Sequence, residues 1–331
     1  MNLAIVIVNY NMGTLILRCL DSLLFLLRDK KVKIVIVDNC STDDSRAIID
    51  AFILKTQFEE RISLFSSPLN GGFAYGNNRG VEFILKDHPD TEFFWFLNPD
   101  TYFKSGDIEK IRDIFLADDR VGIVGTLQTS SVSNQWVCSC FNFPLPVSEL
   151  LRGSQLGFFY RYLTKATIPI KPSEEIKECD WVSGASFFVR RELVDRIGFM
   201  DESYFLYFEE VDFCYRAKSA GWKVVCAPYV DVVHEDKSST GVVSGSLDRP
   251  AFWYDSRRCF YYKCYGFWGV ALADVCWCIG RASFLARYYC GLQSDTSLPS
   301  TNHTKALIWG DIKAALTYCH GKVFNDYKKT G

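Results

Sequence analysis

The segment Leu3-Ala-Ile-Val-Ile-Val8 is an unbroken run of apolar residues, and Val32-Lys-Ile-Val-Ile-Val37 repeats the pattern further along the chain. Between them, residues 15–27 carry apolar side chains at helical spacing. Strands that are apolar on both faces are typical of parallel sheets covered by helices on each side. The three segments therefore predict a βαβ unit, in which ligands bind beyond the carboxyl ends of the strands.

The same alternation continues through the first hundred residues. Apolar patterns predict a helix over 45–58, a strand over 62–65, a helix over 75–86 and a strand over 93–97. This order indicates an α/β fold with a mostly parallel, Rossmann-like central sheet and helices on both faces. We expect residues 1–100 to form its nucleotide-binding half.

Residues 101–245 are predicted to complete a catalytic domain that spans residues 1–245. The pattern weakens from 122 to about 176, which predicts an irregular insertion. Regular segments then return as a strand over 185–189, helices over 192–197 and 209–221, and a strand over 223–227.

The composition limits the classes of protein to consider. The chain has 331 residues, of which 48% are hydrophobic, so it can bury a sizeable core. Its 37 basic and 39 acidic residues leave a formal net charge of -2, which gives no global field to attract nucleic acid or an anionic membrane. We expect no nucleic-acid partner.

Thirteen cysteines are scattered along the chain without the paired spacing of a structural zinc site. Two Cys-x-Cys pairs, Cys138 with Cys140 and Cys276 with Cys278, are open to metal binding, but burial as small apolar side chains is the favoured interpretation. Reduced thiols, and an apolar N-terminus that lacks the basic flank of a leader, predict a cytoplasmic protein.

Asp100 lies in Leu97-Asn-Pro-Asp-Thr101, directly after the predicted strand over 93–97. A carboxylate at the carboxyl end of a buried strand can hold a divalent cation against a diphosphate. Asn-Pro-Asp also opens turns and caps helices readily, so the residues alone leave both roles open.

Asp38 likewise follows a strand, in Val37-Asp-Asn-Cys-Ser-Thr-Asp43. An acidic side chain there can accept hydrogen bonds from a nucleobase N–H or a ribose hydroxyl. Ser41, Asp43 and Asp44 lie where the next helix begins and are assigned mainly to its cap, which leaves Asp38 for the ligand.

The segment Asn70-Gly-Gly-Phe-Ala-Tyr-Gly-Asn-Asn78 combines three glycines, which permit close approach of the backbone, with amides that can bond a sugar or a base. It lacks the lysine of a phosphate-binding loop, and its glycines do not follow the dinucleotide pattern. Both features argue against an NTPase and a dehydrogenase.

Three carboxylates lie within four residues in Tyr204-Phe-Leu-Tyr-Phe-Glu-Glu-Val-Asp-Phe-Cys-Tyr-Arg216. Acids at this density beside aromatic residues are candidates for a functional site, although the first turns of helices also favour acids. On a helix, Glu209 and Asp212 share a face and Glu210 points elsewhere. One acid can therefore face a substrate while another pairs with Arg216.

His234 follows another apolar run, in Val232-Val-His-Glu-Asp-Lys-Ser-Ser239. A single histidine is more often structural than functional. Its position after a strand makes it a candidate to complete a metal site with Asp100 or to touch a diphosphate.

Residues 246–331 are predicted to form a helical extension. Their apolar stretch over 267–279 is interrupted by Asp274 and is shorter than the roughly twenty residues that span a bilayer. Trp268 and Arg281 suit an interfacial helix on a membrane, and a packed pair of helices explains the pattern equally well.

Taken in order, these segments resemble the inverting glycosyltransferase family 2, with its GT-A fold, and most closely its rhamnosyltransferase-like members. The resemblance covers roughly residues 1–265. The segments that carry it are Val6-Ile-Val-Asn-Tyr-Asn11, Val37-Asp-Asn39, Asn70 to Asn78, Asn98-Pro-Asp100, Trp181-Val-Ser-Gly-Ala-Ser186, Phe208-Glu-Glu-Val-Asp212 and His234.

The resemblance implies a role for each segment. The residues that match donor-binding positions are Asn9, Asp38, Asn70, Gly72, Asn78, Asn98 and Asp100. The residues that border the donor sugar and the acceptor are Trp181, Gly184 and Ala185. Asp38 would bind the nucleobase, Asp100 the diphosphate, and Asp100 with His234 a Mg²⁺ or Mn²⁺ ion. Glu209 or Glu210 would be the catalytic base, and Glu210 is preferred because it matches the usual aspartate.

Two departures from the family pattern affect this site. Asn98-Pro-Asp100 stands where many members carry Asp-x-Asp, a variant found in the rhamnosyl branch that leaves fewer carboxylates for the metal. Glu209-Glu210 stands where many carry Glu-Asp, which leaves the identity of the base open.

The resemblance implies transfer of a sugar such as rhamnose, from a donor such as dTDP-rhamnose, to a glycan or lipid-linked saccharide. The product would be a surface polysaccharide (O-antigen, capsule or cell wall), made in the cytoplasm or at the inner face of the cell membrane. A nucleotidyltransferase would need a basic phosphate-gripping loop, and Asn9-Tyr-Asn-Met-Gly13 is followed by no basic residue before Arg18. An inactive glycan-binding scaffold is the other alternative, and the retained acids argue against it.

Overall fold

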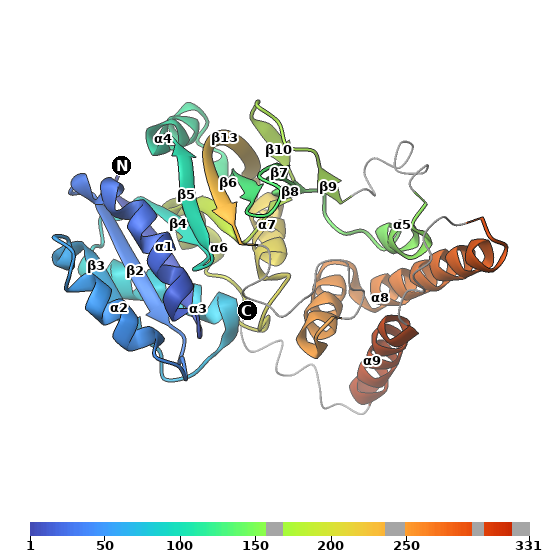
Figure 1. The fold of residues 1–331 in the computed structure, drawn as a ribbon. Coiled ribbons are helices and arrows are strands. Elements are labelled where there is room, and N and C mark those ends of the chain that lie inside the picture. The colour runs from blue at the N-terminus through green and yellow to red at the C-terminus, as the bar shows by residue number, and fades with distance from the viewer. Residues whose placement is uncertain (157–167, 236–248, 293–300, 320–331) are drawn as a thin grey trace. The chain divides into compact units, whose positions relative to one another are not determined.

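The computed structural model describes residues 1–156, 168–235, 249–292 and 301–319 (Figure 1). The chain divides into two compact units. The first contains residues 1–141, 169–205 and 209–241, and the second contains residues 142–168, 206–208 and 242–331.

The first unit is built on a ten-stranded sheet (Figure 1). Its strands are β1 (Leu3–Asn9), β2 (Val32–Asp38), β3 (Ile62–Ser66), β4 (Phe93–Leu97), β5 (Thr101–Gly106), β6 (Val121–Ser130), β7 (Trp136–Val137), β10 (Lys177–Cys179), β12 (Ser186–Arg190) and β13 (Lys223–His234). A second, three-stranded sheet contains β8 (Cys140–Phe141), β9 (Pro169–Ile170) and β11 (Trp181–Val182). The helices of this unit are α1 (Gly13–Leu23), α2 (Ser45–Ile53), α3 (Gly72–Asp87), α4 (Ile108–Ala117), α6 (Arg191–Ile197) and α7 (Glu209–Ser219).

The strand order of the large sheet is β10-β13-β6-β12-β4-β1-β2-β3, with β5 paired to β13 and β7 to β6. The neighbours β4, β1, β2 and β3 run parallel, which confirms the predicted fold class. β12 lies antiparallel between β4 and β6, so that its first residue, Ser186, is opposite Leu97 at the carboxyl end of β4.

Alternate side chains of β1 face opposite sides of the sheet. Ile5 and Ile7 belong to the main core, together with Ile16 and Leu20 of α1 and Phe115 of α4. Each of these side chains is almost completely buried. Burial of several large aliphatic side chains, at about 1.5 to 3 kcal/mol each, is the main favourable term that holds these helices on this face.

The other face of β1 packs closely against α3. A Cβ added to Gly76 would lie 2.6 Å from Cγ1 of Val8, and one added to Gly80 would lie 2.5 Å from Cγ1 of Val6. The two glycines are one turn apart, so α3 presents a smooth side to the sheet. The sequence thus fixes how near the helix approaches the strands.

Gly80→Ala tests this close packing. Helix propensity alone would make the alanine variant more stable by about 1 kcal/mol. Because the new Cβ would overlap with Val6, we expect the free energy of unfolding to fall instead, by about 1 to 3 kcal/mol. Chemical denaturation measures the change, with Lys86→Ala on the exposed side of α3 as control, which should stay within about 0.5 kcal/mol. A stabilised Gly80→Ala protein would contradict the packing.

One sequence prediction is wrong in the middle of the chain. The irregular insertion expected over 122–176 begins with β6, a central strand whose ten residues are all buried. Its glycines and polar residues hide the apolar pattern, and the tertiary contacts of two of them explain their presence. Gly125 lies against Val182, and the Thr129 hydroxyl donates to the Asp231 carboxylate at 2.9 Å.

The strand predicted over 223–227 continues to His234 as β13. Pro228 breaks the apolar pattern, and the pairing with β6 shifts register between Cys226 and Asp231, which accommodates the proline. The extension matters for function because it carries His234 to the same sheet edge as Thr101, its partner on β5.

The second unit is helical, and the predicted C-terminal helical extension is confirmed. It contains α5 (Ser148–Ser154), α8 (Ala251–Tyr289) and α9 (Thr301–Cys319). α8 is kinked at Gly266, whose backbone is left-handed with a φ of 69°. Among the described residues, α8 is the one helix long and apolar enough to cross a membrane, but a core helix of a soluble protein has the same length and composition.

All twelve cysteines whose side chains are described are free thiols. Burial of the Cys-x-Cys pairs holds for Cys140 alone. Cys138 and Cys276 are half-buried, and Cys278 is exposed on α8.

Candidate active site

The segments predicted to form the site meet at one edge of the large sheet. β1 and β2 run parallel and end side by side at Asn9 and Asp38. β12 begins at Ser186 beside the end of β4, and β13 ends at His234, opposite Thr101. The topology therefore gathers the predicted donor, acceptor and metal segments at the place where α/β sheets bind ligands.

Asp38 is held in position by Asn9. Nδ2 of Asn9 donates to Oδ1 of Asp38 and to the Ser41 hydroxyl, each at 3.1 Å. Both Asn9 and Asp38 are buried. Oδ1 of Asn9 accepts no hydrogen bond within the described part of the chain. A buried acceptor without a donor is costly, so an N–H or hydroxyl group of a ligand would be favoured here.

Asn39 connects β2 to the glycine-rich segment. Its Nδ2 donates to Oδ1 of Asn70 at 2.9 Å and to the carbonyl oxygen of Gly72 at 3.0 Å. Its own Oδ1 has no hydrogen-bond partner in the residues that the structure describes. Asn39 is not among the predicted site residues, and its position directly after Asp38 is the signal that could have identified it.

Gly72 permits contact with the chain that leads into α7. It has a φ of +90°, and a Cβ there would overlap with the carbonyl oxygen of Phe205. The backbone N–H of Phe73 donates to the same oxygen at 2.9 Å. A glycine is required at position 72 because both the left-handed backbone and the close contact exclude a side chain.

Asn78 is buried, and its amide group bonds the 200–202 segment. Its Nδ2 donates to the carbonyl oxygen of Met200 at 2.8 Å and to the carboxylate of Glu202 at 2.9 Å, and its Oδ1 accepts from the N–H of Met200 at 3.1 Å. Both of its N–H donors are thus used within the protein. Asn78 therefore holds the 200–202 segment, and its role in donor binding stays a prediction.

Asp100 and His234 form the candidate metal position. Oδ1 of Asp100, which is almost fully buried, lies 3.5 Å from Nε2 of His234. Oδ1 of the neighbouring Asn98 is also buried and has no hydrogen-bond partner among the described side chains and backbone. No group of three or more metal-binding side chains occurs in the described residues. Mg²⁺ and Mn²⁺ often use one or two protein ligands with phosphates and water, and this oxygen and nitrogen set fits such a site.

Two adjacent acids begin α7: Glu209 is buried and Glu210 is half-buried. Burial and the charge of Glu210 raise the pKa of Glu209 well above its usual range. Burial raises the pKa of Glu210 to about 7, against the opposing effect of the N–H groups of Glu210, Val211 and Gly184. One carboxylate oxygen on each accepts no hydrogen bond from the described residues. A carboxylate of this kind can take a proton near neutral pH.

Asp212 is already used to fix the helix. Its carboxylate accepts from the Tyr204 hydroxyl at 3.2 Å and from Nε of Arg216 at 2.8 Å. The Arg216 guanidinium also donates to the carbonyl oxygens of Ile197 and Phe199. The expected pairing of one acid with Arg216 therefore falls to Asp212, which leaves Glu209 and Glu210 for chemistry.

The segment before β12 borders these acids. Gly184 lies against Glu210, with 3.7 Å between the position of an added Cβ and the carboxyl carbon, and the carbonyl oxygen of Ala185 accepts from the N–H of Asn98 at 2.9 Å. The Trp181 ring stacks on Phe141, with 4.2 Å between ring centroids. Aromatic faces of this kind suit the apolar side of a sugar ring.

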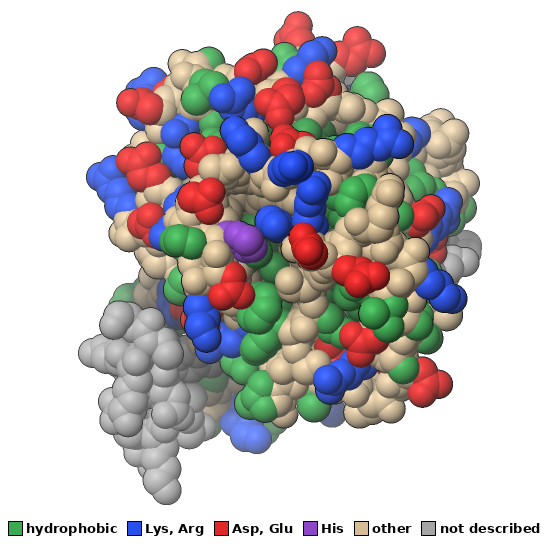
Figure 2. Space-filling view, turned by 90° about the vertical axis from the view of Figure 1, so that its left-hand side faces the viewer, with side chains coloured by type: hydrophobic (Ala, Val, Ile, Leu, Met, Phe, Trp, Pro, Cys, Tyr) green, Lys and Arg blue, Asp and Glu red, His purple; other side chains and the backbone are tan. Residues whose placement is uncertain are grey.

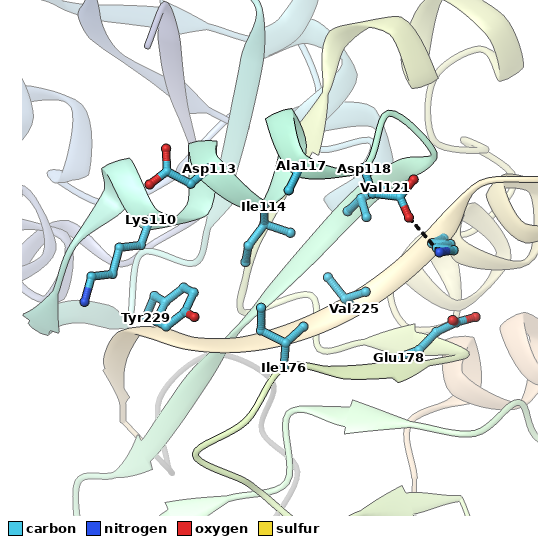
Figure 3. Close-up of a pocket in the computed structure, with 11 residues that line it drawn as sticks. Lys110, Asp113, Ile114, Ala117, Asp118, Val121, Ile176, Glu178, Val225 and Tyr229 are labelled. Atoms are coloured by element: carbon cyan, nitrogen blue, oxygen red, sulfur yellow. Dashed lines mark hydrogen bonds and ion pairs between the residues drawn. The ribbon is translucent and has the colours of Figure 1, made fainter.

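A cavity of about 620 Å³ lies elsewhere in the first unit, between α4, β10 and β13 (Figure 3). Ile114 and Ile176 point into it from opposite sides. At its rim, the Asp118 carboxylate is paired with Lys223 at 2.6 Å. None of the predicted site residues lines this cavity, and we assign no function to it.

Figure 2 shows one face of the molecule, on which acidic and basic side chains are interspersed. A mixed surface of this kind gives no extended field of one sign. The absence of a nucleic-acid partner stays a prediction.

Comparison with known proteins identifies the family. The sequence model of glycosyl transferase family 2 matches residues 4–152, and that of glycosyl transferase family group 2 matches residues 96–318, more than half of the chain. The chain is a family 2 glycosyltransferase. This confirms the resemblance and the predicted sugar transfer, and it argues against the nucleotidyltransferase alternative.

Several relatives of this glycosyltransferase have names that specify rhamnose. It is 28% identical over 253 residues to an N-acetylglucosaminyl-diphospho-decaprenol L-rhamnosyltransferase of Mycobacterium tuberculosis, which covers 72% of this chain and 78% of the relative. It is 24% identical over 241 residues to the dTDP-rhamnosyl transferase RfbF of Shigella flexneri, with 72% and 71% coverage.

Its fold is similar to that of the mannosyltransferase PcManGT from Pyrobaculum calidifontis, solved in complex with GDP-Man and Mn²⁺. The TM-score is 0.52 at 18% sequence identity, over 99% of this chain and 83% of the other. This likeness supports the GT-A fold of the glycosyltransferase.

The raised pKa of Glu210 predicts a pH dependence of stability. Between the ordinary glutamate pKa of 4.5 and about 7, the folded protein binds more protons than the unfolded chain. The free energy of unfolding should therefore fall as the pH rises through this window. Glu210→Gln removes the buried charge. The gain in the free energy of unfolding that it causes should be larger at pH 8 than at pH 5 by roughly 1 to 3 kcal/mol.

Denaturant titration at the two pH values measures this difference. The control is Glu192→Gln, at an exposed glutamate in the first turn of α6, which should show no pH-dependent gain. Equal effects of Glu210→Gln at both pH values would show that Glu210 titrates like an ordinary surface acid.

Proposed function

We propose that this glycosyltransferase moves L-rhamnose from a nucleoside diphosphate donor, such as dTDP-rhamnose, to a lipid-linked saccharide, with inversion at the anomeric carbon. The names of both relatives support the sugar, and the name of the Mycobacterium tuberculosis relative supports the class of acceptor. The product would belong to a surface polysaccharide, and the reaction would take place at the cytoplasmic face of the membrane.

The proposed chemistry is supported mainly by the burial and the raised pKa of Glu210. This residue is half-buried, its pKa is about 7, and the backbone of Gly184 touches its carboxylate. A general base works best when its pKa lies near the working pH, because it is then both deprotonated and sufficiently basic. Glu209 is the alternative base, but its deeper burial and the charge of Glu210 favour its neutral form.

In the proposed reaction, the acceptor hydroxyl attacks the anomeric carbon on the face opposite the diphosphate. The new bond joins the acceptor oxygen to that carbon, the bond from the carbon to the phosphate oxygen breaks, and the hydroxyl proton passes to Glu210. Asp38, oriented by Asn9, would hold the base or ribose of the donor, and Trp181 would provide a face for a sugar ring.

Asp100 and His234 would hold Mg²⁺ or Mn²⁺ in this scheme, with Asn98 beside them. When bound, the cation supplies charge neutralisation for the departing diphosphate. Mn²⁺ in the complex of PcManGT is consistent with this assignment.

Transfer rates should depend on a group with a pKa near 7. We expect kcat/KM to rise with pH through about 7, because Glu210 must be deprotonated to accept the proton. Glu210→Gln should lower kcat by at least about 100-fold and abolish this rise. Steady-state assays across pH measure both, with Glu209→Gln in parallel. If Glu209→Gln removes the pH dependence and Glu210→Gln keeps it, the base is Glu209.

Donor binding is tested separately by calorimetry with a panel of nucleotide sugars, with and without Mn²⁺. We expect one of them, such as dTDP-rhamnose, to bind in a Mn²⁺-dependent way, and Asp100→Asn to weaken this binding by about tenfold or more. Asp119→Asn, at an exposed acid outside the site, is the matched control and should bind like the wild type. If no nucleotide sugar binds to the folded protein, the donor site is contradicted and the inactive glycan-binding scaffold becomes the favoured alternative.

A further inference from the structure

The exposed side of α8 beyond its kink carries no charged residue. Between residues 268 and 289, the exposed side chains are Trp268, Leu272, Val275, Cys278, Ile279, Ala282, Ala286 and Tyr289. Their spacing of mostly three and four residues places them on one face of the helix, here called the α8 stripe. The stripe is strongly exposed, with 80% of Trp268 and 57% of Ile279 accessible to solvent.

The charged residues of the same segment face the interior of the second unit. Asp274 pairs with the buried Arg257 at 3.4 Å, and Arg281 is only 6% exposed. Arg287 donates to the carbonyl oxygen of Ser154. This half of α8 is therefore reversed relative to a water-exposed helix, which carries its charges outside and its apolar residues inside.

α9 shows a related pattern on its exposed side. Trp309, Ile312 and Leu316 are exposed to 65%, 44% and 59%. The charged side chains exposed beside them are Lys305 and Lys313, both basic. Asp311, the acid of this helix, is buried against Arg257 and Arg258.

The exposed charge of the second unit is predominantly basic. Among its described residues, Asp255 is the one exposed acid, and it is paired with Arg258 at 2.8 Å. The exposed apolar residues of α9, with Lys305 and Lys313 beside them, complement an anionic lipid surface, since the lysines can bind headgroups while the apolar side chains enter the layer below. Two copies of such a surface would repel each other through their lysines.

We propose that the α8 stripe and the exposed apolar side of α9 dock the protein on an anionic lipid bilayer, parallel to its surface. Trp268 and Tyr289 lie at the two ends of the stripe, and aromatic residues of this type favour the headgroup level. α8 does not span the bilayer, because Asp274 pairs with the buried Arg257, which also pairs with Glu149 of α5 and Asp311 of α9. The inference is independent of the donor site, which lies in the first unit.

Sedimentation with lipid vesicles tests this proposal on the full chain. The vesicles contain either equal parts of phosphatidylglycerol and phosphatidylcholine or phosphatidylcholine alone. We expect the wild type to sediment with the anionic vesicles and more weakly with the neutral ones. The double variant Leu272→Glu with Ile279→Glu should lower binding to the anionic vesicles by about tenfold or more. Lys305→Glu with Lys313→Glu should weaken binding to anionic vesicles only.

The matched control is Leu54→Glu with Leu116→Glu, two leucines of the first unit that are 71% and 63% exposed. It should bind vesicles like the wild type. The proposal would be overturned if the wild-type protein stays in solution with both vesicle types. It would also be overturned if the stripe variant and the control lose vesicle binding equally. If light scattering shows that the wild type and the control are dimers and the stripe variant is a monomer, the surface binds a second copy of the chain. Donor binding by calorimetry, measured on the same variants, separates failure of this proposal from failure of the proposed function.

Discussion

The burial of Glu209 and Glu210 at the start of α7 is the constraint on which the site depends. Two neighbouring carboxylates removed from water destabilise each other when both are charged, and the protein offsets only part of this cost with N–H groups at the helix start and at Gly184. The part of this cost that the N–H groups do not offset raises the pKa values of the two acids. The free energy cost of burying the charged carboxylates lowers the stability of the fold. The same cost makes Glu210 suited to take a proton at neutral pH.

Such a pair stays buried only if α7 is held firmly. The Asp212 and Arg216 pair fixes the helix to the 197–199 segment, and Gly72 and Asn78 of α3 fix the 200–205 segment that precedes it. α3 is in turn held against β1 through Gly76 and Gly80. Two residues that the sequence suggests for donor binding, Gly72 and Asn78, therefore also help to position the candidate base.

The βαβ alternation was predictable from residues 1–100 because each buried strand there is a continuous apolar run. β6 was not predictable, because its glycines and polar side chains are explained only by partners such as Val182 and Asp231, which are distant in sequence. The acids at 38, 100, 209 and 210 could be selected by their positions after strands or at a helix start. The linking role of Asn39 and the structural role of Asn78 depend on tertiary contacts that one sequence does not reveal.

The central claim is that Glu210 has a pKa near neutrality, and carbon-13 NMR of the glutamate carboxyl groups tests it most directly. The wild-type spectrum should contain a carboxyl resonance that titrates at about pH 7 and is missing from Glu210→Gln. If every glutamate resonance lost in that variant titrates near its ordinary value of about 4.3, the account of the base is contradicted.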